Sequence, residues 1–209
     1  MAGLSLILGI MMGCVVNKSL HYLGENICDM KAGRLFCGFI MGMVSLFFYV
    51  RESLLQEWFF GVLYSAFLLG IALFDYYQGL ILNKVLFFMA AAGLFANYFC
   101  LHLSWIDAFG GTFLGVSVLV GLCFLSHGGI GGGDIKFVGV LGIWLGWQAA
   151  LLSLFLAFTS GAFVGILLVC LRRKERQDHI AFGPFLAGAA FISYVYGSDI
   201  LAFYEVFFL

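Results

Sequence analysis

The sequence predicts an all-α membrane protein with about eight transmembrane helices. Much of the evidence for this prediction comes from its composition. Apolar residues make up 64% of the 209 residues and charged residues 10%, against roughly 25% charged in a soluble domain. The chain contains 25 Phe and 1 Pro, so neither a soluble globular domain nor a disordered chain fits it. Lys and Arg total 10 against 11 acidic residues, which excludes the basic surface of a nucleic-acid-binding protein.

Polar residues divide the chain into eight apolar segments, and a helix needs about 20 such residues to cross a bilayer. In chain order the predicted spans are 2–16, 34–50, 58–74, 80–101, 106–126, 135–146, 149–171 and 181–207. No basic residue precedes the first span, so we interpret it as a retained helix and not as a cleaved signal peptide. The sixth span is short and begins beside a glycine run, which predicts a tilted or broken helix. We expect residues 1–209 to form a single membrane-embedded domain.

The basic residues predict how these spans are oriented. If the connectors alternate sides and the N-terminus is outside, nine of the ten basic residues fall on inside connectors, and Arg51 alone falls outside. Lys and Arg accumulate on the cytoplasmic side of membrane proteins. Merging 135–171 into one span would place Arg172–Arg176 outside and weaken the bias. The charges therefore predict eight spans with both termini outside.

Glycines and cysteines have structural interpretations. Glycines four residues apart let two helices approach closely, and we interpret five such pairs as helix-packing sites: Gly9/Gly13, Gly38/Gly42, Gly111/Gly115, Gly142/Gly146 and Gly161/Gly165. The 6 Cys include no C-x-x-C pair, so neither a disulfide framework nor a zinc site is predicted. We expect no bound metal.

Two aspartates fall at the same predicted membrane face. Asp75 ends the third span, and Asp134 opens the sixth directly after the glycine-rich run 128–133. An ionisable residue beside the hydrocarbon core is costly, which favours a functional role. Each aspartate also has a structural alternative. Asp75 could be a polar boundary residue or an N-cap of the fourth span, and Asp134 could cap a helix after a flexible turn.

The two carboxyl groups together favour acid–base catalysis. When two carboxylates are held a few ångströms apart, one keeps its proton and the other stays charged. The charged partner can act as a base on water, while the protonated partner activates a peptide carbonyl. Glycines before Asp134 would let a substrate backbone lie close to the carboxyl group. The glycine run matches neither a P-loop nor a dinucleotide-binding fingerprint, and the chain has no G-x-S-x-G motif.

At this point the sequence resembles the type IV prepilin peptidases, which are intramembrane aspartyl proteases. Residues 131–134 match the G-x-G-D motif of these proteases. Residues 81–83 follow Asp75 at the offsets where the family has leucine or isoleucine, then proline, then Asp or Asn. Residues 180–186 resemble the family's I-P-F-G-P-F-L element and include the single proline of the chain. With the glycine-rich first helix ending at Asn17, the resemblance covers most of the chain.

The resemblance implies a cofactor-independent aspartyl endopeptidase in the inner (cytoplasmic) membrane of a prokaryote. Its substrates would be prepilins or pseudopilins of type IV pilus or secretion systems, cleaved between a short basic leader and a hydrophobic helix at the cytoplasmic face. Asp75 and Asp134 would share catalysis. Lys136 would lie near the two aspartates, although an interfacial lysine is the alternative interpretation. The candidate substrate-binding residues are Gly131, Gly133, Lys136, Phe182, Gly183 and Pro184.

The chain departs from the family pattern in two respects. Leu82 and Ala181 stand where the family usually has proline. Many bacterial members also carry a larger cytoplasmic segment with two C-x-x-C pairs that bind zinc, and this segment is linked to methylation of the new N-terminus. Here the connector 17–33 contains Cys28 alone, so we expect peptidase activity without N-methyltransferase activity. The alternatives from other classes are a membrane transporter and an inactive assembly factor for pili or secretion.

Overall fold

The computed structural model describes residues 2–23, 30–52, 54–101, 103–126, 129–171 and 181–208, and among these it has helices and no strand. The all-α class is therefore confirmed. In chain order the elements are α1 (Ala2–Leu23), α2 (Met30–Arg51), α3 (Leu55–Gln78), α4 (Asn83–Ala96), the π-helical segment η1 (Asn97–Leu101), α5 (Trp105–Leu125), α6 (Gly132–Cys170) and α7 (Gly183–Phe208).

Helix α6 is broken at Gly146, between the predicted spans 135–146 and 149–171. The backbone of Gly146 has φ 72° and ψ 179°, a left-handed conformation that glycine adopts without steric cost. The first half of α6 packs antiparallel to α5, because Gly111 of α5 lies at Gly146 and Gly115 lies at Val138. The break therefore ends one helical segment and starts another.

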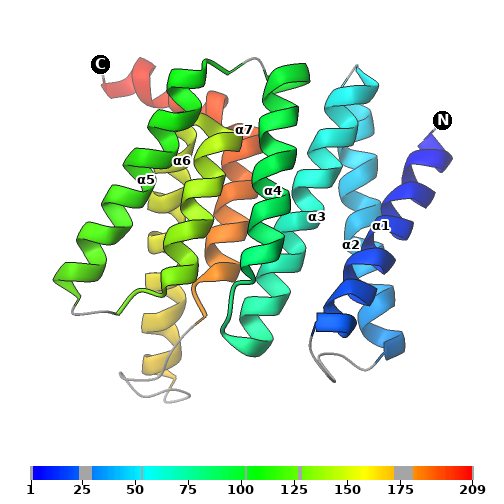
Figure 1. Cartoon of the computed structure of the whole chain (residues 1–209), viewed down its shortest axis with the longest axis horizontal. Helices are drawn as coiled ribbons and strands as arrows, with labels where there is room; N and C mark the ends of the chain where they lie inside the picture. The colour runs from blue at the N-terminus through cyan, green and yellow to red at the C-terminus, as the bar shows by residue number, and fades with distance from the viewer. Residues whose placement is uncertain are drawn as a thin grey trace.

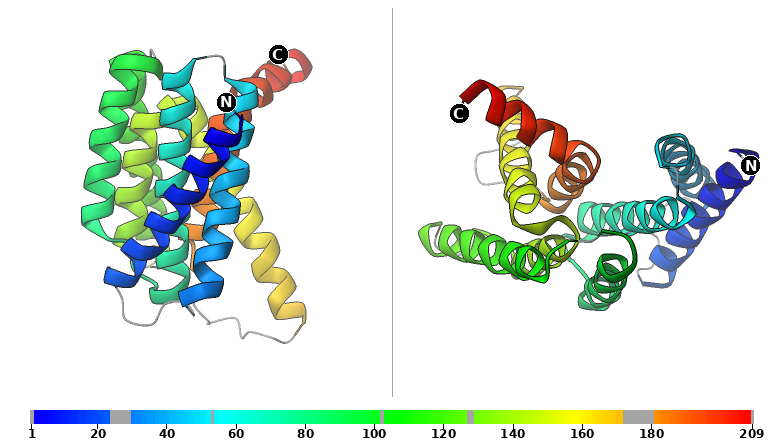
Figure 2. Two further views of the ribbon diagram at one scale, coloured as in Figure 1. Left: turned by 90° about the vertical axis from the view of Figure 1, so that its right-hand side faces the viewer. Right: turned by 90° about the horizontal axis from the view of Figure 1, so that it is seen from above.

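The second half of α6 runs back along α7. Near the break Gly197 lies against Ala149, and further along the Phe158 and Phe182 rings have centroids 5.0 Å apart. With η1 continuing α4 and α6 divided at Gly146, the described residues form eight helical segments, and consecutive segments run in opposite directions (Figure 1). As a result α1 begins and α7 ends at the same end of the bundle, at the top of Figure 1 and of the left view in Figure 2.

Four described helices are long and apolar enough to cross a membrane by length and composition. They are Leu55–Gln78, Trp105–Leu125, Gly132–Leu168 and Gly183–Phe207, and shorter apolar stretches occur at Gly3–Val16 and Leu35–Arg51. The α6 stretch of 37 residues would be about 55 Å long if straight, against a hydrocarbon core of about 30 Å. The break at Gly146 lets this stretch fold back, but the number of crossings and the side of the termini stay predictions.

Glycines of the pairs Gly9/Gly13, Gly111/Gly115 and Gly142/Gly146 bring neighbouring helices together as predicted, whereas a Cβ atom on Gly161 would meet only the Phe185 ring, at 3.8 Å. A Cβ atom on Gly9 or Gly13 of α1 would collide with the backbone of α2, and one on Gly142 of α6 would collide with the backbone of α5 at Gly111 and Thr112. The Thr112 hydroxyl donates to the Gly139 carbonyl across the same contact, at 2.9 Å. Close backbone contact of this kind is how helices pack where lipid removes the hydrophobic driving force.

Aromatic side chains fill the centre of the bundle. Tyr64 of α3 lies between Trp144 of α6 and Tyr194 of α7, with ring centroids 4.8 and 4.7 Å away. The Trp144 Nε1–H donates to the Met89 carbonyl at 3.0 Å, and the Tyr64 hydroxyl donates to the Ala190 carbonyl at 3.4 Å. Because buried polar groups are costly without a partner, these hydrogen bonds tie α3, α4, α6 and α7 into one core.

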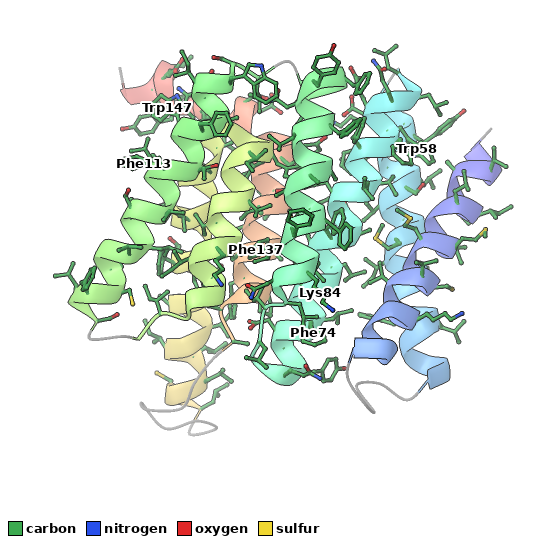
Figure 3. All side chains as sticks on the ribbon, viewed as in Figure 1. Trp58, Phe74, Lys84, Phe113, Phe137 and Trp147 are labelled. Atoms are coloured by element: carbon green, nitrogen blue, oxygen red, sulfur yellow. The ribbon has the colours of Figure 1, made fainter. Side chains whose placement is uncertain are left out.

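Large apolar side chains also cover the outside of the bundle. Phe113 of α5 is 73% exposed and points outward in Figure 3. Phe87, Phe95 and Phe163 are also more than half exposed. Such a surface would be a liability in water but is stable against lipid. Together with the four apolar helices it indicates a membrane protein.

Candidate active site

Asp75 lies one turn before the end of α3, where the bundle has its lower end in Figure 1. The helix continues to Gln78, and Gly79 ends it in the left-handed conformation (φ 64°), donating its N–H to the Asp75 carbonyl at 2.8 Å. Asp75 is only 6% exposed. It does not cap α4, whose N-cap position is occupied by Leu82, so that structural alternative is wrong.

The Asp75 carboxylate is held by the first residue of α7. The Gly183 N–H donates to Asp75 Oδ2 at 2.8 Å. The first N–H groups of a helix have no partner inside the helix and attract negative charge. A Cβ atom on Gly183 would lie 2.6 Å from Asp75 Oδ2, so glycine is required for this approach. The Phe-Gly-Pro element of the sequence therefore contacts the aspartate through its backbone.

Asp134 lies in the first turn of α6, at the same end of the bundle as Asp75. Its backbone N–H donates to the Gly131 carbonyl at 3.1 Å, and the backbone of Gly131 donates to its carboxyl group. Asp134 Oδ1 is buried and has no hydrogen-bond partner among the described residues. Asp75 and Asp134, which are 59 positions apart in the sequence, therefore lie at the same end of the bundle.

Both aspartates line one cavity of about 900 Å³. Its backbone-rich side is formed by Gly79, Gly129 and Gly131, and its apolar side by residues of α6 and α7. The apolar lining residues of α6 include Phe158, Val164 and Leu168, and those in or just before α7 include Ala181, Phe182, Pro184 and Phe185. A cavity with two convergent carboxyl groups and an apolar wall is a typical small-ligand or peptide site.

The other residues that the sequence suggested occupy two kinds of position. Gly131, Phe182 and Pro184 line the cavity with the aspartates. Gly133, Lys136 and Gly183 do not line it. A Cβ atom on Gly133 would lie 3.0 Å from the Ile81 Cβ, so Gly133 permits close packing of α6 against the segment after Asp75.

Lys136 is directed to a neighbouring helix. Its Nζ donates to Asn83 Oδ1, at the start of α4, at 3.0 Å. This bond joins the beginning of α6 to the segment that follows Asp75. It gives Lys136 a positioning contact. The sequence suggested only that Lys136 lies near the two aspartates, and Lys136 does not line the cavity that they share.

Sequence reasoning missed Phe158, Val164 and Leu168 as wall residues of the cavity. They stand inside a long apolar run, where nothing distinguishes a cavity-lining residue from a lipid-facing one. Among the described residues, no group of three or more His, Cys, Asp or Glu side chains could hold a metal ion.

Comparison with known proteins connects this geometry to a family. A sequence model of the type IV leader peptidase family matches residues 62–166, which is half of the chain and includes both aspartates. The chain belongs to the type IV leader peptidase family. No solved structure gives a significant match.

The curated relatives of this chain are named prepilin leader peptidase/N-methyltransferase. The protein from Bacillus subtilis is 31% identical over 159 residues, covering 74% of this chain and 62% of the relative. The Pseudomonas aeruginosa protein is 34% identical over 145 residues, covering 67% and 50%. The Aeromonas hydrophila protein is 44% identical over 81 residues, covering 39% and 28%. The matches thus span less than two thirds of each relative.

Proposed function

We propose that this chain is an aspartyl endopeptidase that removes the leader from type IV prepilin or pseudopilin-like precursors. The single observation that carries the proposal is the cavity lined by both Asp75 and Asp134. Family membership supports a protease acting on prepilins, and the paired carboxyl groups supply a hydrolytic mechanism that needs no cofactor. A transporter would bind its ion near the bilayer midplane, whereas these carboxyl groups lie at one end of the bundle.

The surroundings of the two aspartates divide their roles. Asp75 accepts the Gly183 N–H, which together with the N-terminus of α7 stabilises a negative charge on it. Asp134, with its unpartnered Oδ1, holds the proton. Water gives a proton to Asp75 as its oxygen attacks the scissile carbonyl carbon, and Asp134 protonates the carbonyl oxygen. The C–N bond of the resulting tetrahedral intermediate then breaks, and the leaving amine takes up the proton from Asp75. One hydroxyl of the intermediate returns its proton to Asp134 as the carboxyl product forms, so both aspartates regain their starting states.

The cavity suits an extended segment of substrate. Helical substrate has its amides satisfied internally and must unwind before its carbonyl can be attacked. Gly79, Gly129 and Gly131 line the cavity without side chains, so a substrate backbone can approach the carboxyl groups. The apolar wall of α6 and α7 then accommodates the apolar residues of the precursor.

The aspartates face the cytoplasm in this proposal, which gives a labelling prediction. In a variant with the 6 Cys replaced, a single cysteine at Ser104 should react with a membrane-impermeant maleimide added to intact cells. A cysteine at Lys84 should react only after the cells are opened. Ser104 and Lys84 are both exposed and lie at opposite ends of α4 with its π-helical extension. Labelling of Lys84→Cys from outside would reverse the proposed orientation and contradict cleavage at the cytoplasmic face.

The decisive experiment is incubation of the purified chain with a prepilin, followed by mass spectrometry of the products. We expect one cleavage, between the basic leader and the hydrophobic helix. With a methyl donor present, we expect a mature product carrying a free α-amine, because the connector 17–33 has one cysteine in place of four zinc ligands. If none of the prepilins tested is cleaved, the proposed activity is contradicted. A product heavier by one methyl group would contradict only the absence of methyltransferase activity.

A further inference from the structure

A second cavity lies between α1, α3 and α4 and shares no lining residue with the cavity of the two aspartates. Its volume is about 370 Å³, and its lining residues are apolar. Met12 and Val16 of α1 form one side, Gly70 of α3 forms the floor, and Val85 and Phe88 of α4 form the other side. We call this cavity the α1/α4 groove. The views in Figures 1 and 2 place α1 at the edge of the bundle.

The dimensions of the α1/α4 groove fit one hydrocarbon chain. It follows α3 from Leu63 to Phe74, which is about 16 Å at a helical rise of 1.5 Å per residue. The groove is therefore long in one direction, and its lining residues are apolar over this length. A hydrocarbon chain lying along α3 fits this shape and this lining.

A positive charge marks the end of the α1/α4 groove. Lys84 is exposed, directly precedes Val85 and stands one helical turn before Phe88. In Figure 3 it lies toward the lower end of α4, on the side of α4 toward α1. Lys18 is also exposed and follows the groove residue Val16 by two positions. Among the described residues neither lysine forms an ion pair with an acidic side chain, and a positive charge at the membrane interface attracts the phosphate group of an anionic lipid.

We propose that the α1/α4 groove binds one anionic phospholipid, with an acyl chain between α1 and α4 and the phosphate at Lys84. The apolar lining along α3 selects the acyl chain, and the lysine at the groove end selects the negative headgroup. Lys18 adds to the positive charge at the same membrane interface.

The bound lipid would also contact residues that neighbour the two aspartates in the structure or in the sequence. Ile81 lines the α1/α4 groove and packs against Gly133, one residue before Asp134. Phe74, at the groove end, directly precedes Asp75. An effect of the lipid on cleavage rests on the proposed function, whereas binding of the lipid does not.

The test measures lipid binding by native mass spectrometry of the full-length protein, without reference to cleavage. The protein in detergent is titrated with phosphatidylglycerol or with phosphatidylcholine of the same acyl chains. We expect one phosphatidylglycerol to bind about fivefold tighter than phosphatidylcholine, the preference that one lysine confers near an anionic headgroup. Lys84→Gln should abolish the preference, and Lys84→Arg should retain it. Lys84 is exposed, so neither change disturbs folding.

A second pair of variants tests the chain-binding part of the groove. Gly70 lines the groove, and a Cβ atom on it would lie 3.7 Å from Val16, so Gly70→Leu should fold and fill the space. This variant should lose binding of both lipids. Gly121→Leu, where an added Cβ atom meets nothing within 4 Å, should bind both as the wild type does. Unchanged lipid binding in Gly70→Leu, or an unchanged headgroup preference in Lys84→Gln, would overturn the proposal. Displacement of the lipid by an apolar helical peptide would overturn it too.

Discussion

Replacement of either aspartate by asparagine should abolish cleavage of a prepilin while leaving the fold intact. We expect Asp75→Asn and Asp134→Asn each to lower kcat/KM by about a thousandfold or more, because each removes one of the two groups that move protons. Asparagine has nearly the shape of aspartate, and its Oδ1 can still accept the Gly183 N–H that now reaches Asp75. The loss would therefore report on proton transfer and not on packing. Initial rates with a purified prepilin, at equal amounts of enzyme, measure it.

The double variant and a matched control sharpen this experiment. Asp75→Asn combined with Asp134→Asn should be no slower than either single variant, because groups that act as a unit are not additive. Asp107→Asn is the control, since Asp107 lies in the first turn of α5 at the other end of the bundle. It should cleave at the wild-type rate. Cleavage by Asp75→Asn or Asp134→Asn within tenfold of wild type, with unchanged thermal unfolding, would rule out the two-aspartate mechanism.

Gly183→Ala should give the second large effect, through displacement of the Asp75 carboxyl group. The added Cβ atom would lie 2.6 Å from Asp75 Oδ2, a distance that forces the carboxyl group or the start of α7 to move. A misplacement of about 1 Å in a catalytic group can cost about a hundredfold in rate. We therefore expect kcat to fall by about that factor, with a smaller change in KM. Steady-state kinetics on the purified variant measures both quantities.

The control for this prediction lies on the same helix. Gly188→Ala adds a Cβ atom that meets nothing within 4 Å, so its kinetics should match the wild type. Adding Gly183→Ala to Asp75→Asn should cause no further loss if Gly183 acts through Asp75. An additional hundredfold loss in that double variant would instead indicate that Gly183 contacts the substrate directly.

Much of the fold could be predicted because its determinants are local. The apolar runs and the residues between them indicated each helix to within a few residues, although α1 extends to Leu23 and α3 to Gln78. The break in the apolar stretch 135–171 was also predictable in position. Gly146 there adopts a positive φ, and an apolar stretch much longer than the hydrocarbon core is thick favours such a break.

The contacts of the site could not be predicted because they join residues that are distant in the sequence. Gly183 was suggested as a substrate-binding residue, yet its N–H donates to Asp75, 108 positions away. Lys136 was expected beside the aspartates, but its Nζ bonds to Asn83. Residue type does not indicate which acceptor a backbone N–H will reach, nor toward which group a flexible lysine side chain will extend.

By itself the sequence determined the all-α membrane class, the two aspartates, the glycine-rich approach to Asp134 and the family resemblance. These follow from hydropathy, which acts over one helix, and from residue types whose chemistry is intrinsic. The tertiary structure alone decided the apolar wall of the cavity, the hydrogen bond from α7 to Asp75 and the α1/α4 groove. The wall residue Phe158 and the exposed residue Phe163, which does not line the cavity, stand in the same apolar run of α6. Only the packing of α6 against α7 determines which of the two faces the cavity.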